Sequence, residues 1–285
     1  MINRGQLSVR YMKALAIANG DIAGAISFSE SQGHGWRDVC EAFRAQLAAV
    51  GAEGTTDWQM PQPAALDFSE FLRPMTIIGR LVGLRRVPFR TRTIAATAGS
   101  SAYWSGEKSP RPISHMTFAG STLEQLSVIA MLVATAELLR SSAPSAETLL
   151  SRDLANAAVQ AMDAAFLDNA NSGVPGVMPA SITNGVTAIH SSGLTLAAID
   201  ADLALEAQAL DAAGSNLQFA TFVMRPRTAL YLSQLRGSGG ALAFPQMGVK
   251  GGVAAGLPVI VSNASPSSVG SPQEGGEITL LDPSQ

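Results

Sequence analysis

The chain has 285 residues, of which 47% are hydrophobic and 14% are charged, with a formal net charge of −3. This apolar content is enough for a packed core and excludes global disorder. The slightly acidic balance is far from that of a typical nucleic-acid-binding protein. So few charges on so long a chain indicate that much of its surface is covered by something other than water. The single cysteine, Cys40, excludes an internal disulfide, and we interpret it as a buried structural thiol.

No membrane-spanning segment or targeting signal is predicted. The most apolar stretch, from Val128 to Ala136, has about nine residues, whereas a spanning helix needs roughly twenty. The N-terminal sequence has a basic start, but Asp21 and a broken apolar run make it a poor signal peptide. We therefore expect a soluble chain that is made in the cytoplasm.

Catalytic and metal-binding motifs are missing from the sequence. His34, His115 and His190 lie in unrelated contexts without metal-ligand spacing. The glycines at 237–240 lack the Lys-Ser/Thr pair of a phosphate-binding loop and are interpreted as a flexible loop. A serine triad is recognised by geometry and not by sequence order, so that one class of enzyme stays open. No cofactor and no metal ion is implied.

The first 60 residues carry two helical patterns, at 7–18 and 36–50, separated by the Ser/Gly-rich sequence SFSESQGHG at 27–35. The second pattern is an amphipathic helix, because four apolar side chains follow the three-four spacing. They are Trp36, Val39, Phe43 and Leu47. A loop is expected at 51–65.

The next part of the chain has the alternation of a strand from Val87 to Thr97, then a turn at Gly99 and Ser100, then a returning strand in 115–139. The stretch 100–118 has the composition of a binding or catalytic loop, with three aromatics, a Gly, a Glu-Lys pair and two prolines. Five arginines lie before or within this alternation. Such residues make phosphate contacts, but their alternation along a strand and the net-acidic chain favour inter-subunit salt bridges or a solvated face instead. The arginines are Arg80, Arg85, Arg86, Arg90 and Arg92.

A long amphipathic helix is predicted at 145–168, with Ser145 as N-cap and Glu147 in the first turn. The predicted apolar face consists of Leu150, Leu154, Ala158, Ala161, Met162, Ala165 and Phe166. The predicted polar face consists of Arg152, Asp153, Asn156, Gln160 and Asp163. On this assignment Ala161→Asp buries an unpaired carboxylate and is strongly destabilising, whereas Gln160→Asp is nearly neutral.

The C-terminal third alternates helices and strands. A second amphipathic helix is predicted at 195–214, with Leu196, Ile199, Leu203 and Leu210 on one side. A buried strand at 219–224, a helix opened by Pro226 and a strand at 255–263 follow.

The order of these pieces resembles the tailed-bacteriophage major capsid proteins, which have the Hong Kong-type capsid fold. The resemblance covers about Leu66 to Asp282 and depends on the spacing of motifs that are weak individually. They are YWSGEKSPRPISHMTF on a strand pair, a strand leading to ELLRSSAPSAETLLSRDLANAAVQAMDAAFLDN, the GVPGV loop, FVMRPRTALYLSQL and GLPVIVSN. The resemblance implies an α+β fold with an N-terminal arm, an extended β-hairpin loop, a peripheral domain with a long spine helix, and an axial domain.

The implied domains are an N-terminal arm or helical segment at 1–65, a peripheral domain at 66–175 and an axial domain at 176–285, whose strands can return to the peripheral domain. The peripheral domain includes the extended loop at about 86–115 and the spine helix. The residues implied in inter-subunit contact are Arg90, Arg92, Trp104, Glu107, Lys108 and Arg111. An ordinary local core aromatic is an equally good interpretation of Trp104.

The resemblance implies a major capsid protein, not an enzyme, that assembles into an icosahedral phage or prophage head around double-stranded DNA. Its implied partners are its own copies in pentamers and hexamers, a portal, a maturation protease or scaffold, and DNA bound non-specifically, with no membrane. It would be made in the host bacterial cytoplasm and reside in the virion. Two alternatives remain: an encapsulin-like nanocompartment shell, which shares the fold, and a soluble enzyme of unknown chemistry.

Overall fold

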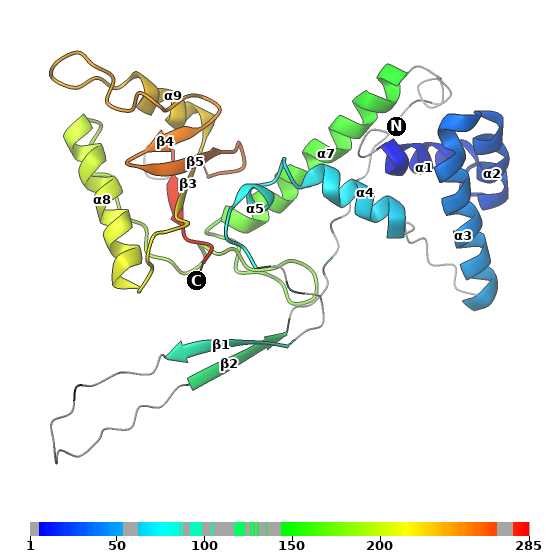
Figure 1. Cartoon of the computed structure of the whole chain (residues 1–285), viewed down its shortest axis with the longest axis horizontal. Coiled ribbons are helices and arrows are strands. Elements are labelled where there is room, and N and C mark those ends of the chain that lie inside the picture. The colour runs from blue at the N-terminus through cyan, green and yellow to red at the C-terminus, as the bar shows by residue number, and fades with distance from the viewer. Residues whose placement is uncertain are drawn as a thin grey trace.

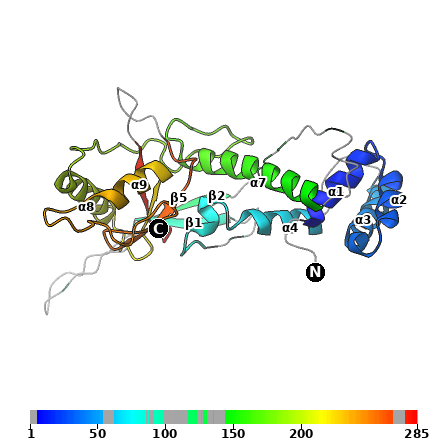
Figure 2. The ribbon, with the colours of Figure 1, turned by 90° about the horizontal axis from the view of Figure 1, so that it is seen from above.

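The structure is a computed structural model, and its described residues form helices and strands of the predicted α+β class. Figures 1 and 2 show an elongated body, with α1–α3 at one end, α7 beside α4 in the middle, and a sheet with α8 and α9 at the other end. The described residues are 6–53, 62–85, 87, 92–98, 104, 117–122, 126, 128, 130, 135, 144–266 and 276–284.

The N-terminal region is a three-helix unit. Both predicted helices are confirmed, but the predicted Ser/Gly-rich linker is wrong, because most of it belongs to a further helix, α2. Asp21 caps α2 by accepting hydrogen bonds from the amides of Ala23 and Gly24. Serine hydroxyls inside α2 donate to backbone carbonyls three or four residues earlier, so these polar groups are satisfied within the helix. The elements are α1 (Gln6–Ile17), α2 (Ile22–Ser31), a short 3-10 helix (His34–Trp36) and α3 (Arg37–Glu53).

This unit has its own aromatic core. The ring of Tyr11 stacks on that of Phe43 at 4.1 Å, and Phe28 meets the edge of Trp36 at 5.6 Å between ring centroids. Cys40 is buried, as predicted. The predicted apolar row of α3 ends at Phe43, because the next member, Leu47, is about half exposed.

Two further helices lie where the sequence analysis placed either a loop or no element. They are α4 (Gln62–Leu72) and the short α5 (Ile77–Arg80). Leu72 of α4 packs against Ala155 and Ala158 of α7, and this tertiary contact explains why a segment of weak local pattern is helical. Thr76 caps α5 by accepting a hydrogen bond from the amide of Gly79.

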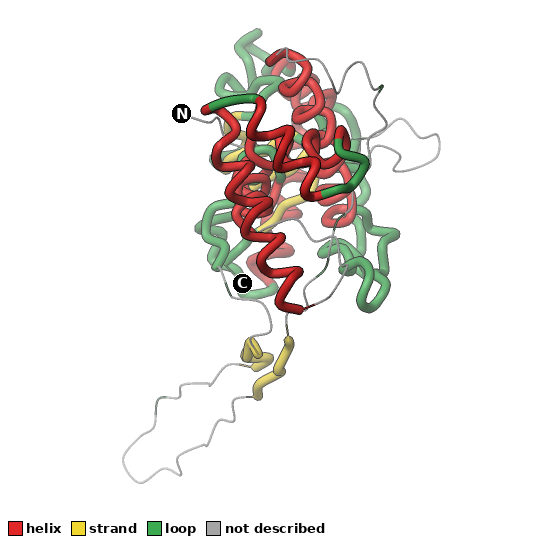
Figure 3. Tube along the Cα trace, turned by 90° about the vertical axis from the view of Figure 1, so that its right-hand side faces the viewer, coloured by secondary structure: helices red, strands yellow, loops and turns green. Residues whose placement is uncertain are grey.

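Strands β1 (Arg92–Ala98) and β2 (Thr117–Thr122) pair antiparallel, with Arg92 opposite Thr122. The expected outgoing and returning strands are thus confirmed over these residues. The predicted strands are too long, because residues 87, 126, 128, 130 and 135 are described and lie in no strand. The expected turn at 99–100 lies outside the described residues. Figures 1 and 3 show this hairpin projecting away from the body of the molecule.

The long helix is α7 (Pro144–Leu167), within one residue of its predicted bounds at each end. Since the helix begins at Pro144, Ser145 lies in its first turn and the N-cap prediction for Ser145 is wrong. Glu147 occupies the first turn, as predicted. Proline is favoured at the start of a helix because its missing amide proton has no partner there.

The C-terminal region is built on a mixed four-stranded sheet of order β4-β5-β3-β6, in which β3 runs parallel to β5 and antiparallel to β6. The predicted helices and strands of this region are confirmed. Strands β4 and β6 were not anticipated. The elements are α8 (Leu196–Ala212), β3 (Thr221–Met224), α9 (Pro226–Gln234), β4 (Gly252–Ala254), β5 (Leu257–Val261) and β6 (Ile278–Leu281).

Both faces of this sheet are covered. Phe222 and Met224 of β3 pack in one cluster with residues of α8 and α9, whereas Val223 packs in a second cluster with Ile77 and Leu167. The alternation follows from the two-residue period of a strand. Strand β3 therefore joins the C-terminal region to the C-terminal end of α7.

Candidate assembly surfaces

The projecting hairpin is the feature that sequence analysis assigned to inter-subunit contact. Trp104, in the connection between its strands, is fully exposed, so the interpretation as a local core aromatic is wrong. Because it is fully exposed, Trp104 also does not pack at the base of the loop within its own chain. Arg92 is the first residue of β1. The other predicted contact residues lie outside the described residues; they are Arg90, Glu107, Lys108 and Arg111.

The arginines before the hairpin divide into two kinds. Arg80 is half-buried and its guanidinium donates to the carbonyl of Val261 at 2.9 Å, so it ties α5 to the end of β5. Arg85 is exposed, which fits both favoured interpretations, an inter-subunit salt bridge and a solvated face. At least Arg80 thus serves the fold of the subunit.

The buried face of α7 differs from the predicted one. Four residues of the predicted apolar face are covered as expected: Leu150 and Ala158 are buried, and Leu154 and Phe166 are half-buried. Ala161 is exposed, so its assignment to the apolar face is wrong. The buried face instead includes Ala155, Asp163 and Leu167.

The predicted polar face of α7 is confirmed except at one position. Asp163, which was assigned to this face, is one of the most buried side chains. The other four residues are exposed: Arg152, Asp153, Asn156 and Gln160.

The first turn of α7 is held to the N-terminal unit by charges. The carboxylate of Glu147 accepts from Arg10 Nε at 3.1 Å and from Lys13 Nζ at 3.3 Å. Both cations also lie over the ring of Trp36, at 5.5 and 5.8 Å from its centroid. Because Lys13 and Glu147 are buried, water screens this pairing weakly. We call these four residues the N-terminal joint.

The last turns of α7 are held by a second buried carboxylate. Asp163 accepts from the backbone amide of Ile77 at 2.9 Å and from the hydroxyl of Ser262 at 3.1 Å. Burial raises the pKa of Asp163, while the two hydrogen bonds act in the opposite direction. One carboxylate thus links α5, α7 and the residue after β5. We call this group the C-terminal joint.

A third group of carboxylates lies on α8 and before β6. Asp202 accepts hydrogen bonds from Ser191 and Ser192, and the Ser192 hydroxyl is the main cause of its lowered pKa. One oxygen each of Glu206 and Glu277 is buried without a hydrogen-bond partner among the described residues. Burial, with the negative charges of Asp202 and Glu277, raises the pKa of Glu206 to about 7.

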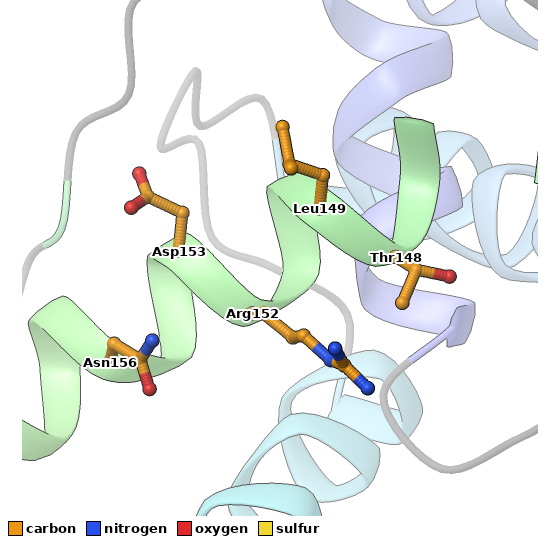
Figure 4. Close-up of a pocket in the computed structure, with 5 residues that line it drawn as sticks. All are labelled: Thr148, Leu149, Arg152, Asp153 and Asn156. Atoms are coloured by element: carbon orange, nitrogen blue, oxygen red, sulfur yellow. The ribbon is translucent and has the colours of Figure 1, made fainter. Parts of the chain in front are cut away.

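Nothing in the described part of the chain has the form of a catalytic centre. Figure 4 shows a pocket whose lining side chains all come from exposed positions of α7. They are Thr148, Leu149, Arg152, Asp153 and Asn156. Among the described residues no three His, Cys, Asp or Glu side chains are placed to hold a metal ion, and no helix is long and apolar enough to cross a membrane.

The two joints were not predicted as such. Glu147 was assigned only to the helix dipole, and nothing in the local pattern of α1 indicates that Arg10 and Lys13 face it. Asp163 was assigned to solvent because it is a carboxylate. Its position supplied one signal: the spacing of four from Val159 and Leu167, both apolar, places Asp163 on the same side of the helix.

Comparison with known proteins agrees with the motif order noted above. The chain is 38% identical over 273 residues to the "Capsid polyprotein" of Pseudomonas phage PAJU2, in an alignment that covers 91% of this chain and 41% of that protein. The chain therefore spans less than half the length of this relative.

Two solved structures are similar at 21% identity. One, from Gordonia phage Cozz, has a TM-score of 0.44 and covers 67% of this chain and 62% of that chain. The other, titled "Capsid of native GTA particle computed with C5 symmetry", has a TM-score of 0.45 and covers 66% of this chain and 67% of that chain. The model of the phage capsid family matches residues 70–285. Since this match takes in most of the sequence, the chain belongs to the phage capsid family.

Proposed function

We propose that this chain is a major capsid protein whose copies assemble, as pentamers and hexamers, into an icosahedral phage head of the Hong Kong type around double-stranded DNA. The observation that carries the proposal is family membership over 70–285 together with a hairpin that leaves the body of the subunit. Its role is structural, and its site is the set of surfaces that meet other copies.

The hairpin suits such a role on physical grounds. A two-stranded ribbon by itself is at best marginally stable in water, so it gains most of its stability from what it lies on. Laid on a neighbour, such an arm buries on the order of 1,000 Å², which is the scale of a specific interface. A fully exposed Trp104 in its connection is the kind of aromatic side chain that protein interfaces favour.

The proposal extends to the parts of the subunit and to its partners. The hairpin and α7 would belong to a peripheral domain at 66–175, and the four-stranded sheet to an axial domain at 176–285. A portal, a maturation protease or scaffold, and DNA bound without sequence preference would be the other partners. The chain would be made in the cytoplasm of the bacterial host and be retained in the virion. The relative's printed name supports a capsid role for the shared segment.

Electron microscopy of the purified chain tests the proposal directly, and the expected result is closed particles. A hairpin deletion sharpens the test. Because Arg92 and Thr122 are register partners, a short Gly-Ser turn can replace residues 93–121 without moving the body. We expect this variant to melt cooperatively but to sediment only as small species. Closed particles from the variant, or its failure to fold, would contradict the role given to the hairpin.

DNA content distinguishes a genome-enclosing head from a shell around protein cargo. Particles made in a host that carries the other phage components should protect DNA from nuclease. Particles that protect no DNA but contain a second protein would contradict the proposed head.

A further inference from the structure

The segment between α7 and α8 has an unusual distribution of polar and apolar side chains. From Asn169 to Ile199 the sequence contains no Asp, Glu, Lys or Arg, although charged residues make up 14% of the chain and Asp168 and Asp200 flank the stretch. In Figure 1 it runs, in light green to yellow-green, from the end of α7 to the start of α8. We call residues 169–195 the uncharged segment.

Three polar side chains of this segment point inward, onto the end of α7. Asn171 donates to the carbonyl of Ala165 at 2.9 Å, Ser181 to that of Phe166 at 2.9 Å, and Thr183 to that of Leu167 at 2.9 Å. These are carbonyls of the last helical turn, which have no partner within the helix. Asn171, Ser181 and Thr183 are accordingly buried. The segment is therefore held in one shape although it has no regular secondary structure.

The large apolar side chains of the same segment are exposed. Val177 and Val186 are each 68% exposed and Leu194 is 75% exposed. Four more are exposed to a smaller degree: Val174, Met178, Ile182 and Ile189. Scattered exposed apolar residues are ordinary, but an uncharged segment that is anchored by three buried polar side chains and exposes seven large apolar ones marks an interaction surface.

We infer that the uncharged segment is an interface with a second copy of this chain. This inference rests on the proposed function, which supplies many identical neighbours. A surface without Lys or Arg lacks the positive charge that dominates binding to DNA phosphates and to anionic lipid head groups. It fits instead another uncharged apolar surface, and depletion of charge is the mark of the buried centre of an interface between protein subunits.

Charge introduced at Val177 tests the inference. At a position that becomes dry on assembly, Val177→Asp and Val177→Lys should both lower the yield of closed particles by about tenfold or more, whatever the sign of the charge. Val177→Thr, which keeps the shape and adds no charge, is the matched control and should assemble at close to the wild-type yield. All three should melt like the wild type, because the side chain is largely exposed in the subunit.

A thiol probe gives an independent measurement that needs no loss of assembly. The thiol introduced by Val177→Cys should react with a soluble maleimide about tenfold more slowly in particles than in free subunits. The buried Cys40 of the wild type gives the background rate. Normal assembly of both charged variants, or equal thiol reactivity in the two states, would overturn the inference while leaving the proposed function intact.

Two further results of these experiments also have a definite interpretation: a charged variant that does not fold, and a wild-type chain that does not associate. If Val177→Asp does not fold, Val186→Asp and the thiol measurement take its place, and the same results decide. If the wild-type chain does not associate under any condition, the proposed function fails and the inference fails with it.

Discussion

The two ends of α7 hold a buried carboxylate each, and the two carboxylates are stabilised in different ways. At the N-terminal joint, Glu147 is surrounded by two cations, Arg10 and Lys13. At the C-terminal joint, Asp163 receives two neutral donors, an amide and a hydroxyl. Both residues are buried.

This difference determines which substitutions of its carboxylate each joint can tolerate. A carboxylate that meets an amide and a hydroxyl can be replaced by a neutral amide of the same shape. The amide oxygen accepts from the Ile77 amide, and the amide NH2 donates to the hydroxyl oxygen of Ser262, which can accept as well as donate. A carboxylate that balances a buried ammonium cannot, because the replacement leaves a desolvated cation without its counter-charge. The C-terminal joint should therefore depend on shape and hydrogen bonding, and the N-terminal joint on charge.

The largest effect is expected at the C-terminal joint. Asp163→Ala removes the acceptor of the buried Ile77 amide and of the Ser262 hydroxyl, and should lower the free energy of unfolding by about 3 kcal/mol. Asp163→Asn should cost less than about 1 kcal/mol. Asp153→Ala, an exposed carboxylate of the same helix, is the control, and urea denaturation is the measurement. Equal losses for the Ala and Asn variants would contradict the assignment to hydrogen bonding.

The opposite pattern is expected at the N-terminal joint. Glu147→Gln keeps the shape but removes the charge, and should cost about 2 kcal/mol, because Lys13 and Arg10 lose their counter-ion. Hydrogen exchange should accelerate in α1 and leave β3 unchanged. Adding Lys13→Met to Glu147→Leu should recover part of the loss, since an apolar pair of similar volume needs no counter-charge. Unchanged exchange in α1 after Glu147→Gln would show that charge does not hold this end.

Glu206 shows a third way to accommodate a buried carboxylate, namely by protonation. Its pKa is raised to about 7 in the folded chain, against an ordinary value of 4.5. The folded state then binds more protons than the unfolded state between these values, so the stability is fully present below about pH 4.5 and is lost as the pH rises toward 7. A pKa difference of this size corresponds to about 3 kcal/mol, and solvent access to the half-buried Glu206 reduces the expected loss to about 1–2 kcal/mol. Glu206→Gln should flatten this slope in pH-dependent unfolding, whereas Asp200→Asn, at an exposed position, should not.

Most of the elements of this fold were predictable from the sequence. Helices α3, α7, α8 and α9 follow from apolar spacing and from Pro144 and Pro226, and β3 and β5 from short apolar runs. These signals are local, since they arise within a single turn or strand. Helix α4 and the short strands β4 and β6 depend on tertiary partners, and local pattern does not contain that information.

The candidate surfaces were predictable to a smaller degree. The position of the hairpin followed from the order of motifs, but the joints of α7 did not, because each pairs residues that are far apart in the chain. The same limit explains the wrong placement of Ala161 and Asp163. Alanine is only weakly hydrophobic, and aspartate is assigned to solvent by its polarity even where it is buried. Neither residue therefore identifies the buried side of a long helix.

The smallest effect is expected where the prediction from sequence was wrong. Ala161 and Gln160 are both exposed, so Ala161→Asp and Gln160→Asp should each change the free energy of unfolding by no more than about 0.5 kcal/mol. Neither side chain belongs to a joint, and a solvated carboxylate at either position keeps its water. Thermal denaturation of the two variants beside Asp163→Ala provides the comparison. If Ala161→Asp alone caused a large loss in the free energy of unfolding, the apolar face assigned from sequence would be the buried one. Asp163 would then not lie at the C-terminal joint. Equal small losses would instead leave Asp163 as the carboxylate around which this end of the helix is packed.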